Sequence, residues 1–267
     1  MLWLIAHHPD YEYAGTPFVR ILPFQPHYAE AKALWLQKAA SVGNNVAVLS
    51  NASSALSFEP QTSRELANRA LALRPGDPKL HELLADSFER EMRDADSTQQ
   101  RQAAAKKALE AWEAYEAIEP RQNERYRHYL DLANTAYEAD DLSKAKRYAT
   151  ELLAHPQLEV GTNEPNGDEI HIANTVLGRI ALRGGDIEEA KRRLHASAST
   201  KGSPVLDSYG PRMSLAAELL DHNEKEAVVS YLHECSRFWQ DGGDELKQWE
   251  SDIQAGRKPN FGENLRP

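Results

Sequence analysis

Apolar residues recur along this chain at the spacing of one helix face. The stretch over residues 173–197 shows this most clearly, with a first apolar face made by Val176, Leu177, Ile180 and Ala181. Glycines follow at positions 184 and 185, where a chain leaving a helix can adopt a positive φ without steric cost. Asp186 then stands at the position of a helix N-cap, and a second apolar face begins at Ile187. This stretch predicts two helices joined by a tight turn.

The same periodicity predicts helices along most of the chain, while strand patterns are nearly absent. The expected helices cover residues 2–7, 27–41, 45–58, 60–74, 78–92, 98–118, 122–139, 142–155, 168–183, 186–198, 209–222, 224–239 and 243–256. The most polar connectors between them are residues 94–102 and 159–168. The predicted fold class is therefore all-α.

Small residues at helix crossings carry a family resemblance. One stretch resembles a tetratricopeptide repeat (TPR), an antiparallel helix pair of about 34 residues, through six residues: Leu177, Gly178, Ala181, Gly185, Ala190 and Leu194. A looser form of the pattern recurs, and its equivalent small residues are separated by 45, 37, 45 and 37 positions: Ser63, Ala108, Ala145, Ala190 and Ala227. These intervals indicate inserted residues in the connectors. The C-terminal part, with the segments GSPVLDSYGPRMSLAAELL, ECSRFW and GRKPNFG, also resembles uncharacterised bacterial TPR-like proteins.

The resemblance implies a right-handed solenoid of antiparallel helix pairs over residues 29–239. Residues 1–28 are expected to form an N-terminal capping segment, because their prolines forbid a continuous helix while their aromatic residues favour packing on the first helices. Residues 240–267 are expected to form a C-terminal capping helix and an extended tail. Trp239, Trp249 and Phe261 are candidates for holding that tail in place.

Net charge, cysteine count and the length of apolar stretches argue against several classes of function. The chain of 267 residues has a formal net charge of −10, which argues against a phosphate-binding surface, so we expect no nucleic-acid partner. A single cysteine, Cys235, excludes an intrachain disulfide and cysteine-based zinc sites. The chain has no apolar stretch long enough to span a membrane. These features favour a cytoplasmic protein, with a periplasmic or secreted one as the alternative if a signal peptide has been removed.

Catalytic and cofactor motifs are absent, so we expect no enzyme, no cofactor and no metal. The densest ligand-type cluster is His7, His8 and Asp10, for which polar capping of a helix end is the simpler interpretation. Cys235 lies on an apolar helix face, which predicts a buried, unreactive thiol. His171 and Asn174 lie one helical turn apart, so they are interpreted either as a buried polar pair that satisfies neighbouring backbone or as ligand contacts in a groove.

The family resemblance locates the expected binding groove. In a TPR solenoid the first helix of each pair lines the concave surface, where partners lie. Helix phase then predicts one exposed stripe with Arg127, Asn134 and Tyr137, and a second with Thr175, Arg179 and Arg183. The arginines are suited to an acidic partner or a free C-terminal carboxylate. The lysine by which some TPR proteins clamp such a carboxylate is not matched, since Leu130 stands one turn before Asn134.

The leading functional hypothesis is a non-catalytic TPR-like scaffold that binds a protein or peptide in its concave groove. One alternative is a structural accessory subunit of a larger assembly, which exposed aromatic residues near either end would favour. The other is an enzyme on a helical-repeat frame, with His171, Asn174 or the N-terminal histidines in its site.

Overall fold

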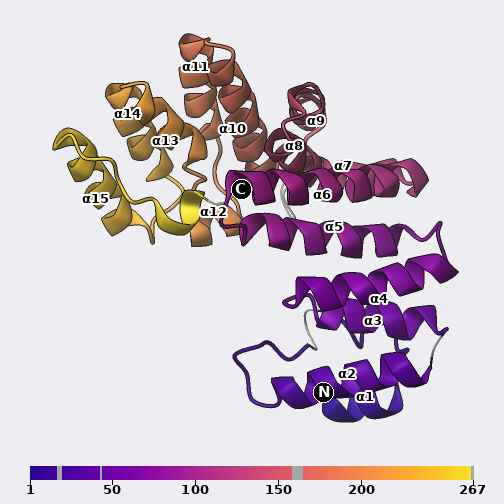
Figure 1. The fold of residues 1–267 in the computed structure, drawn as a ribbon. Coiled ribbons are helices and arrows are strands. Elements are labelled where there is room, and N and C mark those ends of the chain that lie inside the picture. Colours follow the sequence, from indigo (N-terminus) through magenta and orange to yellow (C-terminus); the bar gives the residue numbers. More distant parts are fainter. Residues whose placement is uncertain (17–19, 43, 158–164, 266–267) are drawn as a thin grey trace. The chain divides into compact units, whose positions relative to one another are not determined.

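The computed structural model describes residues 1–16, 20–42, 44–157 and 165–265, and every regular element in these ranges is a helix (Figure 1). This confirms the all-α prediction. The chain divides into two compact units, residues 1–122 (unit 1) and 123–267 (unit 2). The expected three segments (1–28, 29–239 and 240–267) remain a prediction.

Unit 1 is a succession of helices in which each packs mainly against the next (Figure 1). Its helices are α1 (Leu2–His7), α2 (Tyr28–Ser41), α3 (Val46–Ala55), α4 (Pro60–Leu73), α5 (Pro78–Arg93) and α6 (Thr98–Ile118). Helices α3 and α5 also contact each other, so both belong to one side of the unit. Several begin at a side-chain cap, as where Ser97 accepts a hydrogen bond from the backbone N–H of Gln100 at 3.2 Å.

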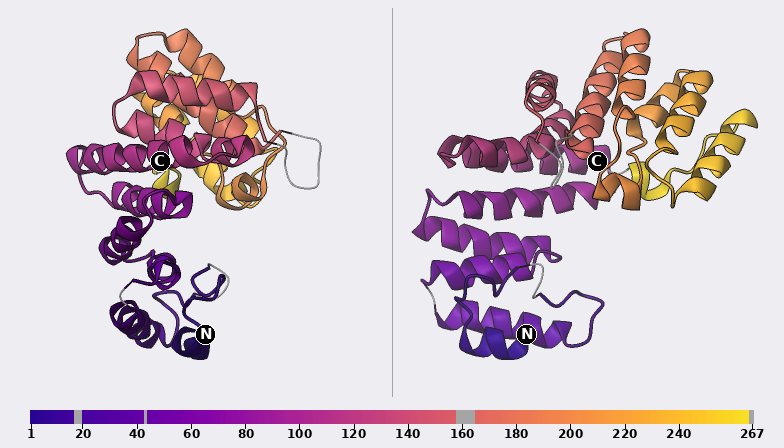
Figure 2. Two further views of the ribbon diagram at one scale, coloured as in Figure 1. Left: turned by 90° about the vertical axis from the view of Figure 1, so that its right-hand side faces the viewer. Right: turned by 180° about the vertical axis from the view of Figure 1, so that it is seen from behind.

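Unit 2 is also built of packed helices (Figure 2). They are α7 (Gln122–Arg127), α8 (Tyr129–Glu138), α9 (Leu142–Ala154), α10 (Gly167–Arg183), α11 (Ile187–Ser197), α12 (Pro204–Tyr209), α13 (Ser214–Asp221), α14 (Lys225–Cys235), α15 (Gly243–Gln254) and the 3₁₀ helix η1 (Gly262–Leu265). Helix α10 contacts both α8 and α13 in addition to α9 and α11. Of the predicted connector over residues 159–168, residues 159–164 lie outside the described residues.

The turn between α10 and α11 forms as the pattern predicts. Gly185 has a φ of 82°, and the Asp186 carboxylate accepts a hydrogen bond from the backbone N–H of Glu189 at 3.0 Å. Gly178 lies where α10 and α13 approach closely, because a Cβ built there would lie 2.3 Å from a methyl carbon of Leu215.

Two predicted helices are interrupted in the structure. The helix expected over 122–139 breaks at His128, and this break brings the ring of Tyr129 to 5.3 Å from the ring of Tyr148 on α9. The helix expected over 209–222 begins only at residue 214. Gly210 has a φ of 80° and lies against the Trp239 ring, so the chain turns there after a short helix that the pattern did not predict.

The N-terminal segment packs on α3 through a series of turns. The side-chain amide of Asn51 donates to the backbone carbonyls of Pro9 and Tyr11, both at 2.9 Å. Ser54 donates to the carbonyl of Gly15 at 2.8 Å, and a Cβ on Gly15 would lie 2.3 Å from the carbonyl oxygen of Asn51. These contacts fix the start of the segment that carries Arg20. The expected packing on the first helices is confirmed, although residues 17–19 lie outside the described residues.

The C-terminal tail is held by aromatic packing, as predicted. The rings of Trp239 and Trp249 lie 5.6 Å apart, and Trp249 meets Phe261 edge-on at 5.0 Å. The indole N–H of Trp249 donates to the carbonyl of Asn260 at 3.0 Å. The tail is not extended throughout, because η1 follows Phe261.

Candidate binding sites

The residues predicted to line a groove lie on three helices of unit 2. Arg127 ends α7, Asn134 and Tyr137 lie on α8, and α10 carries His171, Asn174, Thr175, Arg179 and Arg183. The prediction that Asn134, Tyr137 and Thr175 are exposed was wrong, since all three are buried. Helices α8, α9 and α10 pack tightly enough to enclose these positions.

His171 is a buried structural residue. Its Nε2 accepts a hydrogen bond from the backbone N–H of Arg212 at 2.8 Å, so Nδ1 carries the proton and donates to the carbonyl of Ser197 at 3.0 Å. Burial lowers the pKa of the imidazole to about 4. Both ring nitrogens therefore satisfy backbone groups of neighbouring segments, and the ring is neutral near pH 7.

Asn174 and Thr175 are also satisfied within unit 2. The amide of Asn174 donates to the carbonyl of Ile170 at 2.9 Å and accepts from the guanidinium of Arg193 at 3.1 Å. Thr175 donates to the carbonyl of His171 at 2.8 Å. These side chains stabilise the packing of α10 and α11 and are not directed at a ligand.

Arg179 connects three helices of unit 2. It donates to Glu138 on α8 at 2.9 Å and to Glu218 on α13 at 2.8 Å, and its guanidinium carbon lies 4.1 Å from the ring centroid of Tyr137. Only 14% of its side chain is exposed. Burial lowers the pKa of Arg179, but the charges of Glu218 and Glu138 outweigh this effect and raise it above its ordinary value. The positive charge of Arg179 is therefore neutralised by carboxylates of the same chain.

The other two predicted arginines are likewise paired. Arg183 donates to Asp140 at 2.6 Å and lies 5.6 Å from the ring centroid of Tyr137. The hydrogen bond to Asp140 raises the pKa of Arg183. Arg127 donates to Glu124 at 3.1 Å. The arginines that were expected to receive an acidic partner already hold carboxylates of this protein.

A second arrangement of arginines around an aromatic ring lies in unit 1, and no pattern along the chain predicted it. Phe58 follows α3, and the guanidinium carbons of Arg20 and Arg90 lie 4.9 and 4.4 Å from its ring centroid. Arg20 and Arg90 border a cavity of about 400 Å³ that also reaches Ser54, Ser57, Ser63, Ser87 and Arg93. We call it the arginine cavity.

The two arginines at Phe58 differ from those of unit 2 in their partners. Arg20 donates to the hydroxyl of Ser57 at 2.8 Å, and its Nε is buried with no hydrogen-bond acceptor among the described residues. Neither Arg20 nor Arg90 forms an ion pair with a carboxylate in the part of the chain that the structure describes. Burial lowers the pKa of Arg90, and the nearby charge of Arg93 lowers it further.

Two carboxylates that line the arginine cavity are paired with cations of the same lining. Glu89 accepts from the indole of Trp112 at 2.7 Å and lies 3.6 Å from a guanidinium nitrogen of Arg93. Glu82 pairs with Lys79 at 3.0 Å. Asp86 also borders the cavity, and its charge and that of Asp94 act on Arg90 in the opposite direction to the arginines. The cavity therefore has charges of both signs, with guanidinium groups gathered at Phe58.

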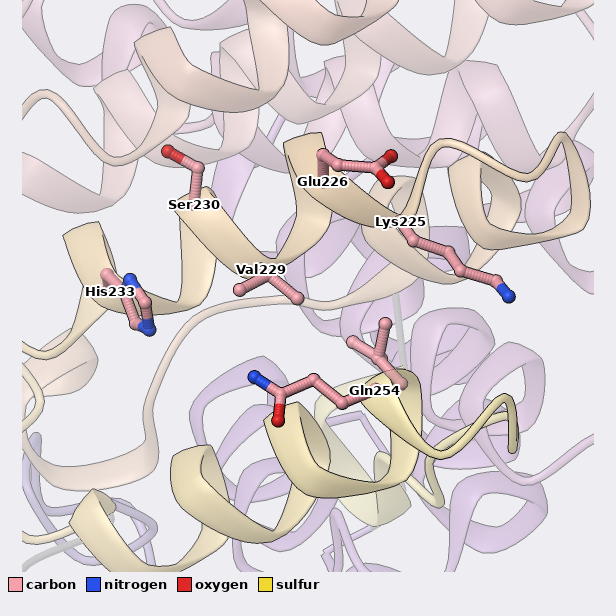
Figure 3. A pocket seen from close by; sticks show the side chains of 7 residues that line it. Lys225, Glu226, Val229, Ser230, His233 and Gln254 are labelled. Atoms are coloured by element: carbon pink, nitrogen blue, oxygen red, sulfur yellow. The ribbon is translucent and has the colours of Figure 1, made fainter.

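Unit 2 contains a cavity of about 490 Å³ between α14 and α15 (Figure 3). Val229 of α14 and Gln254 of α15 point toward one another across it, with Lys225 at one end and His233 at the other. His233 lies 3.0 Å from a carboxylate oxygen of Glu250. The cavity is lined by both apolar and polar side chains, and neither charges of one sign nor nucleophiles cluster in it.

Reactive groups elsewhere are buried or scattered. Burial raises the pKa of the Cys235 thiol to about 12, which confirms the prediction of a buried thiol and makes it unreactive near neutral pH. His7 stacks on Trp3 at 4.8 Å and contacts the carbonyl of Trp3 through Nδ1. Among the described residues no group of three or more His, Cys, Asp or Glu side chains has the geometry of a metal site.

No helix within the described ranges is both long enough and apolar enough to cross a membrane. Comparison with protein-family models and with curated proteins gave no match.

Proposed function

We propose that this chain is a TPR-like scaffold that binds a protein or peptide and does not catalyse a reaction. The proposed architecture is a right-handed solenoid in which α3, α5, α8, α10 and α13 are first helices of antiparallel pairs. The contacts of α3 with α5, and of α10 with α8 and α13, support this assignment, because first helices of successive repeats neighbour one another in such arrays.

The observation that carries the proposal is the arginine cavity. It is bordered by α3 and α5, the proposed first helices of unit 1, and so belongs to the surface on which a solenoid binds its partners. The arginines of unit 2 are the less suitable binding residues, since Arg179 and Arg183 are paired with internal carboxylates.

Site-directed photo-cross-linking tests the proposal. A benzophenone amino acid replaces Asp86, an exposed residue of α5 at the cavity, and in a matched control it replaces Glu65, an exposed residue of α4. In lysate of the source cells we expect one protein to be captured at position 86 and not at position 65. Equal capture at both positions, or capture at position 65 alone, would contradict binding on the α3–α5 surface.

The N-terminal aromatic residues favour a second candidate, a structural accessory subunit. Trp3, Tyr11, Tyr13 and Phe24 expose 63%, 51%, 53% and 82% of their surface, whereas the aromatic residues of the C-terminal tail are buried. Several exposed aromatic side chains in one short segment are typical of a contact surface. Replacing Trp3 and Phe24 by serine would abolish co-purification with an assembly if this candidate is right and leave it unchanged if the α3–α5 surface binds the partner.

The structure gives less support to an enzyme on this frame. Both ring nitrogens of His171 are hydrogen-bonded to backbone groups, and the side chain of Asn174 is satisfied at both ends. A catalytic histidine needs a nitrogen that can reach the substrate.

A further inference from the structure

We infer that the arginine cavity is a carboxylate-binding site and that the partner presents an acidic peptide segment to Arg20 and Arg90. The inference rests on the proposed function, since it names the chemistry that the α3–α5 surface recognises. It commits to a peptide carboxylate, and a phosphate-bearing ligand is one of the outcomes that would overturn it.

The first argument is the gathering of like charges. Arg20 and Arg90 lie over one ring, and Arg93 is close enough to lower the pKa of Arg90. Arg93 is paired with Glu89, but the guanidinium groups of Arg20 and Arg90 repel one another, so an anion between them relieves the repulsion and gains charge-assisted hydrogen bonds. Among the described residues a serine hydroxyl accepts from Arg20 and neither arginine at Phe58 forms an ion pair, although the charges of Asp94 and Asp86 act on Arg90.

The second argument is an unsatisfied donor. The Nε–H of Arg20 is buried without an acceptor among the described residues, and buried donors of this kind are rare in folded proteins. The hydroxyl of Ser57 accepts from Arg20, which leaves its own proton able to donate. A ligand with oxygen acceptors fits both groups.

The third argument comes from unit 2, where the same chain shows what such an arrangement binds. There two arginines approach the ring of Tyr137, and their partners are the carboxylates of Glu138, Glu218 and Asp140. In unit 1 the ring and the arginines are present, but neither Arg20 nor Arg90 forms an ion pair with a carboxylate among the described residues. A carboxylate supplied by a partner would complete the arrangement.

Charge at the cavity edge favours a carboxylate over a phosphate. The carboxylates of Glu82, Asp86 and Glu89 line the cavity together with Arg93 and Lys79, so the local positive charge is modest. A singly charged carboxylate suits this field, whereas a dianionic phosphate would meet more repulsion.

The test measures binding of a fluorescein-labelled hexaglutamate peptide, blocked at both ends, to the full chain by fluorescence anisotropy. We expect saturable binding that weakens at high salt, and no binding of the matching hexaglutamine peptide. Arg20→Gln and Arg90→Gln should each weaken binding at least about tenfold, because each removes a charge-assisted hydrogen bond.

Arg64→Gln is the matched control. Arg64 lies 4.4 Å from the ring centroid of Phe88, as Arg90 does from that of Phe58, but it is paired with Glu91. Its loss should leave hexaglutamate binding within about twofold of the unmodified chain. A hexaglutamine peptide with a free C-terminus separates the two sources of carboxylate: binding there assigns a C-terminal carboxylate, and its absence assigns acidic side chains.

The inference would be overturned if hexaglutamate did not bind, or if inorganic phosphate competed more strongly than glutarate at equal ionic strength. It would also be overturned if Arg64→Gln and Arg90→Gln weakened hexaglutamate binding equally, or if Arg20→Gln or Arg90→Gln did not weaken it. Cross-linking at position 86 separates this failure from that of the proposed function. If the cross-link to a partner persists in Arg90→Gln, the scaffold proposal stands and the carboxylate site fails. If hexaglutamate binds while no partner is captured at position 86, the carboxylate site stands and the scaffold proposal fails.

Discussion

Two aromatic rings in this protein are each approached by two arginines, and the two arrangements differ in how the positive charge is matched. At Tyr137 in unit 2, Arg179 and Arg183 are paired with Glu138, Glu218 and Asp140. At Phe58 in unit 1, Arg20 and Arg90 lie beside a cavity and form no ion pair among the described residues.

Residue type and helix phase therefore do not by themselves identify a binding arginine. Both pairs combine a cation with an aromatic face, which stabilises the charged group in either setting. In unit 2 the charge is matched within the fold, so these arginines contribute mainly to stability. In unit 1 Arg20 and Arg90 form no ion pair among the described residues, which suits these arginines to binding.

The largest expected effect follows from Arg179→Gln. The substitution leaves the carboxylates of Glu138 and Glu218, of which 10% and 33% is exposed, without their cation. Breaking a largely buried ion pair from one side should lower the free energy of unfolding by roughly 3 kcal/mol. Urea unfolding followed by circular dichroism measures the loss, and hydrogen exchange should locate it in α8, α10 and α13. Arg90→Gln is the matched comparison and should change stability by less than about 0.5 kcal/mol. Equal losses in the two variants would contradict the distinction between the arrangements.

The second effect is a pH dependence that belongs to unit 2. The pKa of His171 is lowered to about 4 in the folded chain from an unfolded value of about 6.5. Between these values the unfolded state binds the proton and the folded state does not, so the stability present above pH 6.5 is lost as the pH falls toward 4. Between pH 7 and pH 5 the titration of His171 should lower the free energy of unfolding by about 2 kcal/mol. His171→Gln should be less stable at pH 7 and should show a smaller decrease over the same pH range. An unchanged decrease in the variant would assign the pH dependence to other groups.

The third prediction concerns how Arg20 is positioned. Gly15→Ala places a Cβ about 2.3 Å from the carbonyl oxygen of Asn51, so the N-terminal segment must shift on α3. Overpacking of this kind costs about 1–2 kcal/mol. Because the segment carries Arg20, hexaglutamate binding should also weaken although no charge is removed. Gly76→Ala is the control, since nothing lies within 4 Å of a Cβ at that position. Binding unchanged in Gly15→Ala would show that Arg20 does not depend on this packing.

The sequence predicted the helices well because their signals are local. Apolar spacing, the glycines at 184 and 185 and the cap at Asp186 lie within one helical hairpin, and the hairpin forms as expected. The break at His128 was missed because the apolar spacing continues across it, whereas the contact of Tyr129 with Tyr148 beside the break joins two helices and leaves no local signal. The short helix before Gly210 was missed for a similar reason, since its end is set by the ring of Trp239.

The candidate site could not be predicted from the sequence for the same physical reason. Arg20 lies in a proline-rich segment, Phe58 at the end of a predicted helix and Arg90 on another helix, and only the fold brings them together. Helix phase did identify Arg179 and Arg183 on α10, but it carried no information about the carboxylates of Glu138, Asp140 and Glu218. Sequence reasoning therefore located arginines without indicating which of them are already paired.

The smallest expected change in stability comes from a substitution that makes unit 1 resemble unit 2. Ser57→Asp places a carboxylate where the Ser57 hydroxyl now accepts from Arg20 at 2.8 Å. A new, partly exposed ion pair should raise the free energy of unfolding by about 0.5–1 kcal/mol. The same carboxylate should compete with an external one, so hexaglutamate binding should be lost although Arg20 and Arg90 are both present. Ser57→Asn, which has the same shape without the charge, should retain most of the binding. If Ser57→Asp binds hexaglutamate as well as Ser57→Asn does, the arginines at Phe58 do not act on carboxylates, and the two arrangements would differ in geometry rather than in role.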